Sequence, residues 1–167
     1  EEGFPFIVTE YIGGQRVIDL IKAGNGRIDT NTACAIILQL CRALTHAHAI
    51  GIIHRDISPQ NIMLDGATVK LIDFGMAKSL YDTESNLSME NTIYGTPTFM
   101  SPEQCLRKDL DHRSDIYSLG CVFFMMLTGI PPFREKGLVD LVRAHVSKEP
   151  PLDTPGIDPA LLPILEK

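Results

Sequence analysis

Apolar residues recur with helical spacing over the stretch that follows Asp29. They fall three or four positions apart, at Ala33, Ile36, Ile37, Leu40, Cys41, Leu44 and Ala47. This spacing places them on one face of a helix, which Asp29 or Thr30 can cap and Gly51 can end. The pattern therefore predicts a long helix with one buried face.

Other stretches predict helices of a different character. The segment that begins near Asp115 is apolar almost all round until Thr128-Gly129, which is typical of a helix buried inside the fold. Residues 17–23 and 138–146 show shorter helical patterns, and residues 160–167 begin one more. The chain is therefore predicted to be mainly helical.

Strand signals occur in only two places. Residues 4–8 form a short apolar and aromatic run, and residues 62–72 indicate two short strands around Asp65-Gly66. Because Asp-Gly strongly favours a tight hairpin turn, this segment should bring Asn61 and Asp73, at its two ends, towards one point. The predicted fold class is α+β, a mainly helical body with a small β-hairpin.

Composition fits one soluble domain. The chain has 167 residues, of which 44% are hydrophobic and 22% charged, so a buried core can form. The net charge of −6 and the scattered lysines and arginines argue against a nucleic-acid partner. The longest apolar run, residues 121–127, is far shorter than the roughly 20 residues that span a bilayer, so these residues give no sign of membrane attachment.

The four cysteines suggest neither a zinc site nor a disulfide framework. None of them forms a Cys-x-x-Cys pair. Cys34 and Cys41 lie seven positions apart on one face of a predicted helix, and we expect both thiols to be buried. A reducing cytoplasm fits this usage, although the parent protein could carry a membrane anchor outside these residues.

Candidate chemistry gathers at the two ends of the predicted hairpin. The run His-Arg-Asp-Ile-Ser-Pro-Gln-Asn places Asp56 five positions before Asn61, and the intervening Pro59 indicates a loop. Asp73 follows twelve positions later, in Asp-Phe-Gly. Asp56 can accept a proton, whereas the second carboxylate and the amide oxygen can hold a hard cation such as Mg²⁺.

These two loops resemble the catalytic loop and the metal-binding loop of protein kinases. The resemblance implies that Asp56 is the catalytic base and that Asn61 and Asp73 bind Mg²⁺, with Mn²⁺ as an alternative. The cofactor would be ATP. The same resemblance gives His54 and Phe74 structural roles, with Phe74 packing inward to set the direction of Asp73.

The first strand and the residues after it resemble the last N-lobe strand and the hinge of a kinase. On this resemblance Thr9 is the gatekeeper, and the backbone of Glu10 and Ile12 binds adenine. Met63, on the hairpin, would lie under the adenine ring. A threonine gatekeeper is small, which implies an accessible pocket behind the adenine.

Residues 76–94 resemble an activation loop, which a phosphate can order. Thr92 matches the main activating phosphosite of many Ser/Thr kinases, and Ser88 is the second candidate. A phosphate on Thr92 could pair with Arg55 and so link the order of this loop to catalytic geometry. The alternative, an unmodified loop threonine, stays open.

The run from Gly95 to Gln104, Gly-Thr-Pro-Thr-Phe-Met-Ser-Pro-Glu-Gln, resembles the substrate-docking segment of Ser/Thr kinases, in the form found in bacterial kinases of the eukaryotic type. Thr96 would contact Asp56 and help to place the acceptor hydroxyl. Glu103 would need a buried arginine partner, and no suitable arginine follows in the chain. Asp115 is expected to hydrogen-bond the backbone near His54 and Arg55, in addition to any capping of its own helix.

Two departures from the family stand out. Ser58 occupies the position where Ser/Thr kinases usually carry a lysine that reaches the γ-phosphate. In addition, the chain resembles only the hinge, in residues 1–14, and most of the C-lobe, in residues 15–167. Because the Gly-rich loop and the N-lobe lysine are missing, we expect these residues alone to bind ATP poorly and to have little or no activity.

The implied function is transfer of the γ-phosphoryl of ATP to Ser or Thr hydroxyls of proteins, including self-phosphorylation in trans. One alternative is a pseudokinase that acts as a scaffold, which only Ser58 supports. Another is a kinase-like small-molecule phosphotransferase, which would share the base and metal loops. The docking run favours a protein kinase over a small-molecule phosphotransferase. The preference would be reversed if the purified parent protein modified an antibiotic or a sugar but no protein.

Overall fold

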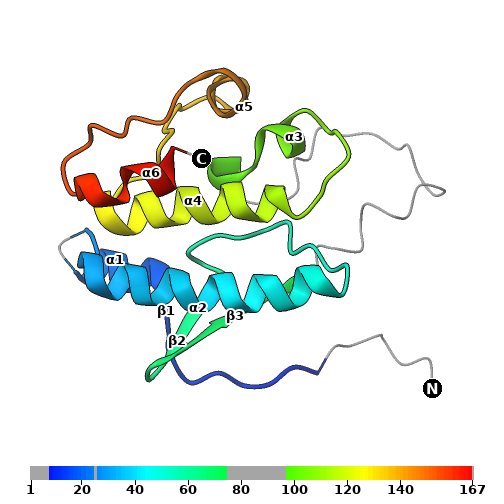
Figure 1. Cartoon of the computed structure of the whole chain (residues 1–167), viewed down its shortest axis with the longest axis vertical. Coiled ribbons are helices and arrows are strands. Elements are labelled where there is room, and N and C mark those ends of the chain that lie inside the picture. The colour runs from blue at the N-terminus through cyan, green and yellow to red at the C-terminus, as the bar shows by residue number, and fades with distance from the viewer. Residues whose placement is uncertain (1–7, 25, 75–96, 167) are drawn as a thin grey trace.

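Two antiparallel helices form the centre of the molecule (Figure 1). The structure is a computed structural model, and it describes residues 8–24, 26–74 and 97–166. Helix α2 spans Thr30–Ala49 and helix α4 spans Arg113–Thr128. His48, near the end of α2, contacts Asp115 at the start of α4, while the amide of Ile28 donates to the carbonyl of Met126 at the other end. These two contacts fix the antiparallel direction.

Helix α2 forms as its pattern predicts. Asp29 is the N-cap, and its carboxylate accepts a hydrogen bond of 3.0 Å from the amide of Thr32, which lowers the pKa of Asp29. Gly51, just past the helix, has a φ of 77° that glycine adopts without strain. The buried face comprises Ala33, Ile36, Leu40, Leu44 and Ala47.

The expectation that both cysteines of α2 are buried is wrong. Cys41 is exposed and Cys34 is half-buried. Cys41 directly follows the buried Leu40, and Cys34 directly follows the buried Ala33. A residue next in sequence to the centre of the buried face points to the edge of that face. Helical spacing alone did not distinguish the edge of the stripe from its centre.

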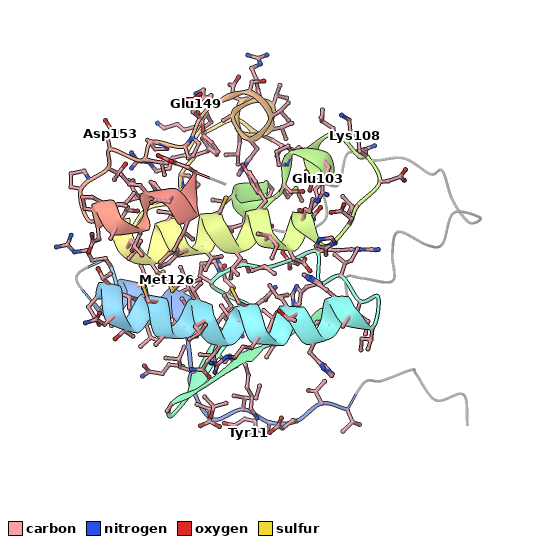
Figure 2. All side chains as sticks on the ribbon, viewed as in Figure 1. Tyr11, Glu103, Lys108, Met126, Glu149 and Asp153 are labelled. Atoms are coloured by element: carbon pink, nitrogen blue, oxygen red, sulfur yellow. The ribbon has the colours of Figure 1, made fainter. Side chains whose placement is uncertain are left out.

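Helix α4 is buried along most of its length, as expected. Gly129 ends it with a φ of 82°, and a side chain there would collide with the backbone of Gly26. One apolar core joins α2, α4 and α1, which spans Val17–Ala23. Figure 2 shows Met126, which is fully buried, between α2 and α4.

A three-stranded antiparallel sheet lies on the side of α2 away from α4 (Figure 1). Strands β2, Ile62–Asp65, and β3, Thr68–Leu71, form the predicted hairpin, and Gly66 in its turn has a φ of 60°. The sequence pattern did not indicate β1, Gln15–Arg16, which pairs with β2. Just before β1, the missing side chain of Gly14 lets the backbone approach Leu64 closely.

Short elements cover the other side of α4 (Figure 1). They are η2, Pro97–Phe99; α3, Pro102–Cys105; α5, Leu138–Ser147; η3, Pro159–Leu161; and α6, Leu162–Leu165. A second small core of Phe133, Leu141 and Ala144 lies under α5. In the part of the chain that the structure describes, no helix is long and apolar enough to cross a membrane.

The α+β architecture with a mainly helical body and a hairpin is confirmed. The strand predicted at residues 4–8 lies outside the described residues apart from Val8, which is in no strand and is 83% exposed. The division into a hinge region, residues 1–14, and a helical lobe, residues 15–167, stays a prediction.

Candidate active site

The catalytic loop is anchored on one buried carboxylate. Asp115, 1% exposed, accepts hydrogen bonds of 2.9 Å from the backbone amides of His54 and Arg55. The contacts predicted for Asp115 are therefore present. Its Oδ2 atom also lies 2.7 Å from Nε2 of His48, a residue that the sequence did not single out as functional. Three donors on one carboxylate keep this buried charge well solvated by the protein.

His54 links the catalytic loop to the loop after β3. Its side chain is fully buried, and Nε2 lies 2.9 Å from the carbonyl oxygen of Ile72. Because a carbonyl can only accept, Nε2 carries the proton, and Nδ1 accepts from the amide of Asp56 at 3.3 Å. Burial lowers the pKa of His54, opposed by the Ile72 carbonyl and the charge of Asp115. The neutral ring therefore connects the two loops.

Asn61 lies against Asp56, a contact that the sequence did not predict. Its side-chain nitrogen donates to both the carbonyl and the Oδ2 atom of Asp56, each at 2.9 Å. The carbonyl of Asn61 accepts from the amide of Ile72 at 2.9 Å, which holds the next residue, Asp73, at the same end of the hairpin. Because the amide nitrogen of Asn61 is occupied by Asp56, the amide oxygen is the atom that can bind a cation.

Asp73 and Phe74 follow directly. Asp73 has a φ of 62°, a conformation that aspartate tolerates better than most residues. The ring of Phe74 packs edge-on against His54, with centroids 4.5 Å apart. The expectation that Phe74 packs inward is wrong in part, because 40% of the residue stays exposed. His54 covers one side of the ring only.

Asn61 and Asp73 fit a hard divalent cation. A carboxylate and an amide oxygen are the ligand types that Mg²⁺ prefers, and Mg²⁺ commonly takes its remaining ligands from water and substrate phosphates. Within the described residues, no group of three or more His, Cys, Asp or Glu side chains is placed to bind a metal by itself. The donor set therefore suits a cation that arrives with a phosphorylated ligand.

The predicted hinge residues form an extended segment before β1. Thr9 and Glu10 are exposed, and Ile12 is half-buried. The carboxylate of Glu10 pairs with Nζ of Lys70 on β3 at 2.5 Å, which connects this segment to the hairpin. Met63, half-buried on β2, lies opposite Lys70 in the sheet. The adenine-binding roles of these residues stay predictions.

Ser58, which stands where the family usually carries a lysine, is enclosed by the fold. It is fully buried, and its hydroxyl has no hydrogen-bond partner among the described residues. Its carbonyl accepts from the amide of Asn61 at 3.0 Å, which helps to close the loop between Asp56 and Asn61. A serine here supports the backbone of the loop and cannot supply a positive charge.

Glu103 has a serine partner. Its Oε1 atom accepts a hydrogen bond of 2.5 Å from the hydroxyl of Ser114, a buried residue in the first turn of α4. The expectation of a buried arginine partner, which no described residue of this chain supplies, stays a prediction. A hydroxyl close to the start of α4 can satisfy the carboxylate at this position.

Gln104 is a residue that sequence reasoning missed. Its side-chain nitrogen donates to the carbonyl of Arg55 at 2.7 Å, and its side-chain oxygen accepts from the amide of Ser101 at 2.9 Å. The Ser-x-x-Gln pattern with Pro102 at the helix start is the signature of a capping box and could have indicated α3. Nothing local in the sequence indicates the contact with Arg55.

Three predicted residues lie outside the described residues. They are the phosphosite candidates Thr92 and Ser88 and the docking residue Thr96. The described part of the docking run ends in η2 and α3, and the buried hydroxyl of Ser118 on α4 holds the carbonyl of Phe99 at 2.7 Å. The docking run is thereby attached to the same helix as the catalytic loop.

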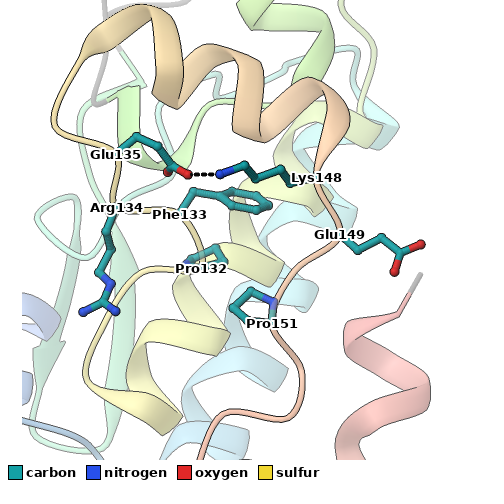
Figure 3. A pocket seen from close by; sticks show the side chains of 7 residues that line it. All are labelled: Pro132, Phe133, Arg134, Glu135, Lys148, Glu149 and Pro151. Carbon is teal, nitrogen blue, oxygen red and sulfur yellow. Dashed lines mark hydrogen bonds and ion pairs between the residues drawn. The ribbon is translucent and has the colours of Figure 1, made fainter.

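An open pocket of about 440 Å³ lies elsewhere, beside α5 (Figure 3). It is lined by Pro132, Phe133, Arg134, Glu135, Lys148, Glu149 and Pro151. The Glu135 and Lys148 side chains form an ion pair across it (Figure 3). None of the residues predicted to bind nucleotide or metal lines this pocket.

Asn61 lies against Asp56 at the start of a hairpin, and the chain leaves that hairpin at Asp73, which is the order of residues found in protein kinases. The family model described as "Protein kinase domain" matches residues 2–152. The chain belongs to the protein kinase domain family.

Curated bacterial relatives point the same way. The chain is 41% identical over 160 residues to a probable serine/threonine-protein kinase PknB of Bifidobacterium longum, covering 93% of this chain and 23% of the relative. It is 39% identical over 171 residues to serine/threonine-protein kinase PknB of Mycolicibacterium smegmatis, covering 98% of this chain and 27% of the relative. The predicted resemblance to bacterial kinases of the eukaryotic type is confirmed. The chain spans about a quarter of the length of these relatives.

Proposed function

We propose that the protein transfers the γ-phosphoryl of ATP to Ser or Thr hydroxyls of proteins. The observation that carries this proposal is the contact between Asn61 and Asp56, at the end of the hairpin from which the chain also leaves into Asp73. The relatives are named as serine/threonine-protein kinases, which supports this specificity over a small-molecule phosphotransferase.

Each of the three polar residues has a distinct role in this proposal. Asp56 orients the acceptor hydroxyl and accepts its proton, and the bond from Asn61 to Oδ2 holds the carboxylate in place. The Asn61 amide oxygen and the Asp73 carboxylate would hold Mg²⁺, or Mn²⁺ in its place. The cation would supply positive charge next to the transferred phosphoryl. Positioning and electrostatics, rather than covalent chemistry, supply most of the rate.

Other predicted residues complete the site. The backbone of Glu10 and Ile12 binds adenine, Thr9 borders the pocket and Met63 lies beneath the base. Thr96 helps to place the acceptor hydroxyl. Phosphorylation in trans on Thr92 or Ser88 would create an anion that pairs with Arg55, next to the base.

A phosphotransfer assay on the full-length protein that contains these residues tests the proposal. It compares the unaltered protein with Asp56→Asn and with Asp65→Asn, the same change on the exposed turn of the hairpin. We expect the unaltered protein and Asp65→Asn to phosphorylate casein and their own residues 75–96, and Asp56→Asn to be inactive. A folded protein that binds magnesium-ATP without any transfer would be a pseudokinase.

A further inference from the structure

Arg55 adopts a conformation that the surrounding structure must enforce. Its φ is 70°, in the left-handed region that residues other than glycine rarely occupy. A hydrogen bond holds the peptide unit on each side. The Arg55 amide donates to Oδ1 of Asp115 on α4 at 2.9 Å, and the Arg55 carbonyl accepts from Nε2 of Gln104 on α3 at 2.7 Å. Two different helices thus fix this one residue.

The second of these bonds acts directly on the catalytic base. Because a peptide unit is planar, the Arg55 carbonyl and the Asp56 amide move together as one rigid plane. The Asp56 amide makes a long contact of 3.3 Å with Nδ1 of His54. The bond from Gln104 to the Arg55 carbonyl is shorter, at 2.7 Å, and this peptide plane sets the direction in which Asp56 leaves the backbone.

Gln104 is itself held in one orientation. Its side-chain oxygen accepts from the backbone amide of Ser101 at 2.9 Å, and its backbone amide donates to the Ser101 hydroxyl at 3.3 Å. Ser101 is fully buried. Rotating the Gln104 side-chain amide by half a turn would set its oxygen against the Arg55 carbonyl and its nitrogen against the Ser101 amide. The capping box thereby aims the Gln104 donor at the catalytic loop.

We propose that Gln104 is a positioning residue for Asp56, and that it couples α3 to the geometry of the catalytic base. The proposal rests on the proposed function, in which Asp56 orients the acceptor hydroxyl. The run predicted to dock the protein substrate ends in α3. A displacement of that run would therefore be transmitted to Asp56 through the side-chain amide of Gln104.

The substitution Gln104→Glu separates this role from helix capping. A glutamate keeps an oxygen that can accept from the Ser101 amide, so the capping box is retained. It loses the N–H donor and places a second oxygen against the Arg55 carbonyl. In the full-length protein with casein as substrate, we expect kcat to fall by about 10- to 100-fold, because catalysis is sensitive to small misplacements of the base. The KM for ATP should change by less than about two-fold, because Gln104 binds no nucleotide.

Two additional readouts report on the hydrogen bond itself. Amide hydrogen exchange at Arg55 and Asp56 should be faster in Gln104→Glu than in the unaltered protein, because the plane is no longer held. The Arg55 carbonyl oxygen faces the introduced carboxyl and should raise its pKa above the ordinary value of about 4.3. The ratio of the variant's kcat to that of the unaltered protein should therefore rise as the pH is lowered from about 8 to about 6, because a protonated carboxyl regains an O–H donor. A purely structural role for Gln104 predicts neither result.

Gln39→Glu is the matched control. It is the same change on α2, where the side-chain nitrogen of Gln39 donates to the Ala67 carbonyl at 3.1 Å and its side-chain oxygen accepts from the Val69 amide at 3.0 Å, away from the catalytic loop, so kcat should be unchanged. The proposal is overturned if Gln104→Glu leaves kcat and exchange unchanged, or if Gln39→Glu reproduces both effects. If the unaltered protein transfers no phosphate, the proposed function fails, and hydrogen exchange alone then decides whether Gln104 holds the Arg55–Asp56 plane.

Discussion

The two ends of the α2–α4 interface are built from opposite kinds of side chain. At one end the core residues Ile36, Val122 and Met126 are apolar and buried. At the other end buried polar residues lie among the apolar ones, and Asp115 accepts from a histidine side chain and two backbone amides. Apolar burial has no preferred direction, whereas a hydrogen bond weakens steeply when its angle changes. The apolar end therefore supplies stability, and the polar end fixes peptide planes.

This difference explains where the proposed chemistry lies. The catalytic loop carries Arg55 in a left-handed conformation, whereas among the described residues at the apolar end only glycines, such as Gly26 and Gly129, have a positive φ. Buried hydrogen bonds from α4 and α3 offset the strain of that conformation. We therefore expect substitutions at the apolar end to change stability, and substitutions at the polar end to change catalytic geometry as well.

The substitution Asp115→Asn should have the largest effect, because it acts on both properties. An amide has one acceptor oxygen, so either the His54 or the Arg55 amide loses its partner. We expect the free energy of unfolding to fall by about 2–3 kcal/mol, the cost of an unsatisfied buried donor next to a lost charge. We expect kcat of the folded protein to fall about 100-fold. Urea unfolding and steady-state kinetics on the full-length protein measure the two.

Asp111→Asn is the control for this change. Asp111 is largely exposed just before α4, where it accepts from the amide of Arg113 at 2.8 Å. Its substitution should shift stability by less than about 1 kcal/mol and leave kcat unchanged. Normal activity in Asp115→Asn would show that the polar end does not hold the catalytic loop.

Met126→Ala should affect stability only. Met126 is fully buried at the apolar end, and its truncation leaves a cavity that costs about 2–5 kcal/mol. Because no hydrogen bond of the catalytic loop changes, kcat measured well below the melting temperature should stay within about two-fold of the original. Met125→Ala, at a half-buried neighbour, should destabilise less. If Met126→Ala lowers kcat as much as Asp115→Asn does, the separation of the two ends is wrong.

Acid should destabilise the polar end selectively, because that end carries the buried His54. Burial lowers the pKa of its imidazole in the folded protein relative to about 6.5 in the unfolded chain. The unfolded state then binds the proton more tightly, so stability is full above pH 6.5 and is lost as the pH falls towards the lowered pKa. The urea midpoint should decline as the pH falls below about 6.5.

His54→Phe removes this titration while keeping a ring beside Phe74. The variant should be less stable at neutral pH, since it loses the bond to Ile72, but its midpoint should depend less on pH. His145, beneath α5, is also buried, and burial lowers its pKa as well, so part of the slope should remain. If the urea midpoint of His54→Phe depends on pH as strongly as that of the unaltered protein, His54 is not the source of the pH dependence.

The sequence predicted the elements better than it predicted the contacts between them. Helices α2 and α5 and the β2–β3 hairpin follow from signals within a few residues, namely apolar spacing, Asp29 as a cap and Asp-Gly in the turn. Strand β1 has two residues and pairs through its backbone, so no side-chain pattern marks it. Its existence depends on the hairpin being in place.

The site shows the same limit. The Asp56, Asn61 and Asp73 spacing was visible because all three lie in one short segment, formed by the catalytic loop and the hairpin that follows it. The bonds that hold the loop join residues far apart, 67 positions for His48 and Asp115 and 49 for Gln104 and Arg55. Such partners become neighbours only once α2, α3 and α4 pack. Glu103 illustrates the consequence, because its partner Ser114 could not be identified until the packing was known.

The smallest effect should come from an ion pair outside both ends of the interface. Lys70 and Glu10 are only 2.5 Å apart, but their side chains are 30% and 70% exposed, so water and salt screen them. We expect Lys70→Met to change the free energy of unfolding by less than about 1 kcal/mol. Lys108→Met, at an exposed lysine for which the described residues offer no ion pair, controls for the loss of charge. A larger loss in Lys70→Met alone, measured by urea unfolding at low and high salt, would mean that an exposed polar contact can hold the hinge segment as firmly as Asp115 holds the catalytic loop.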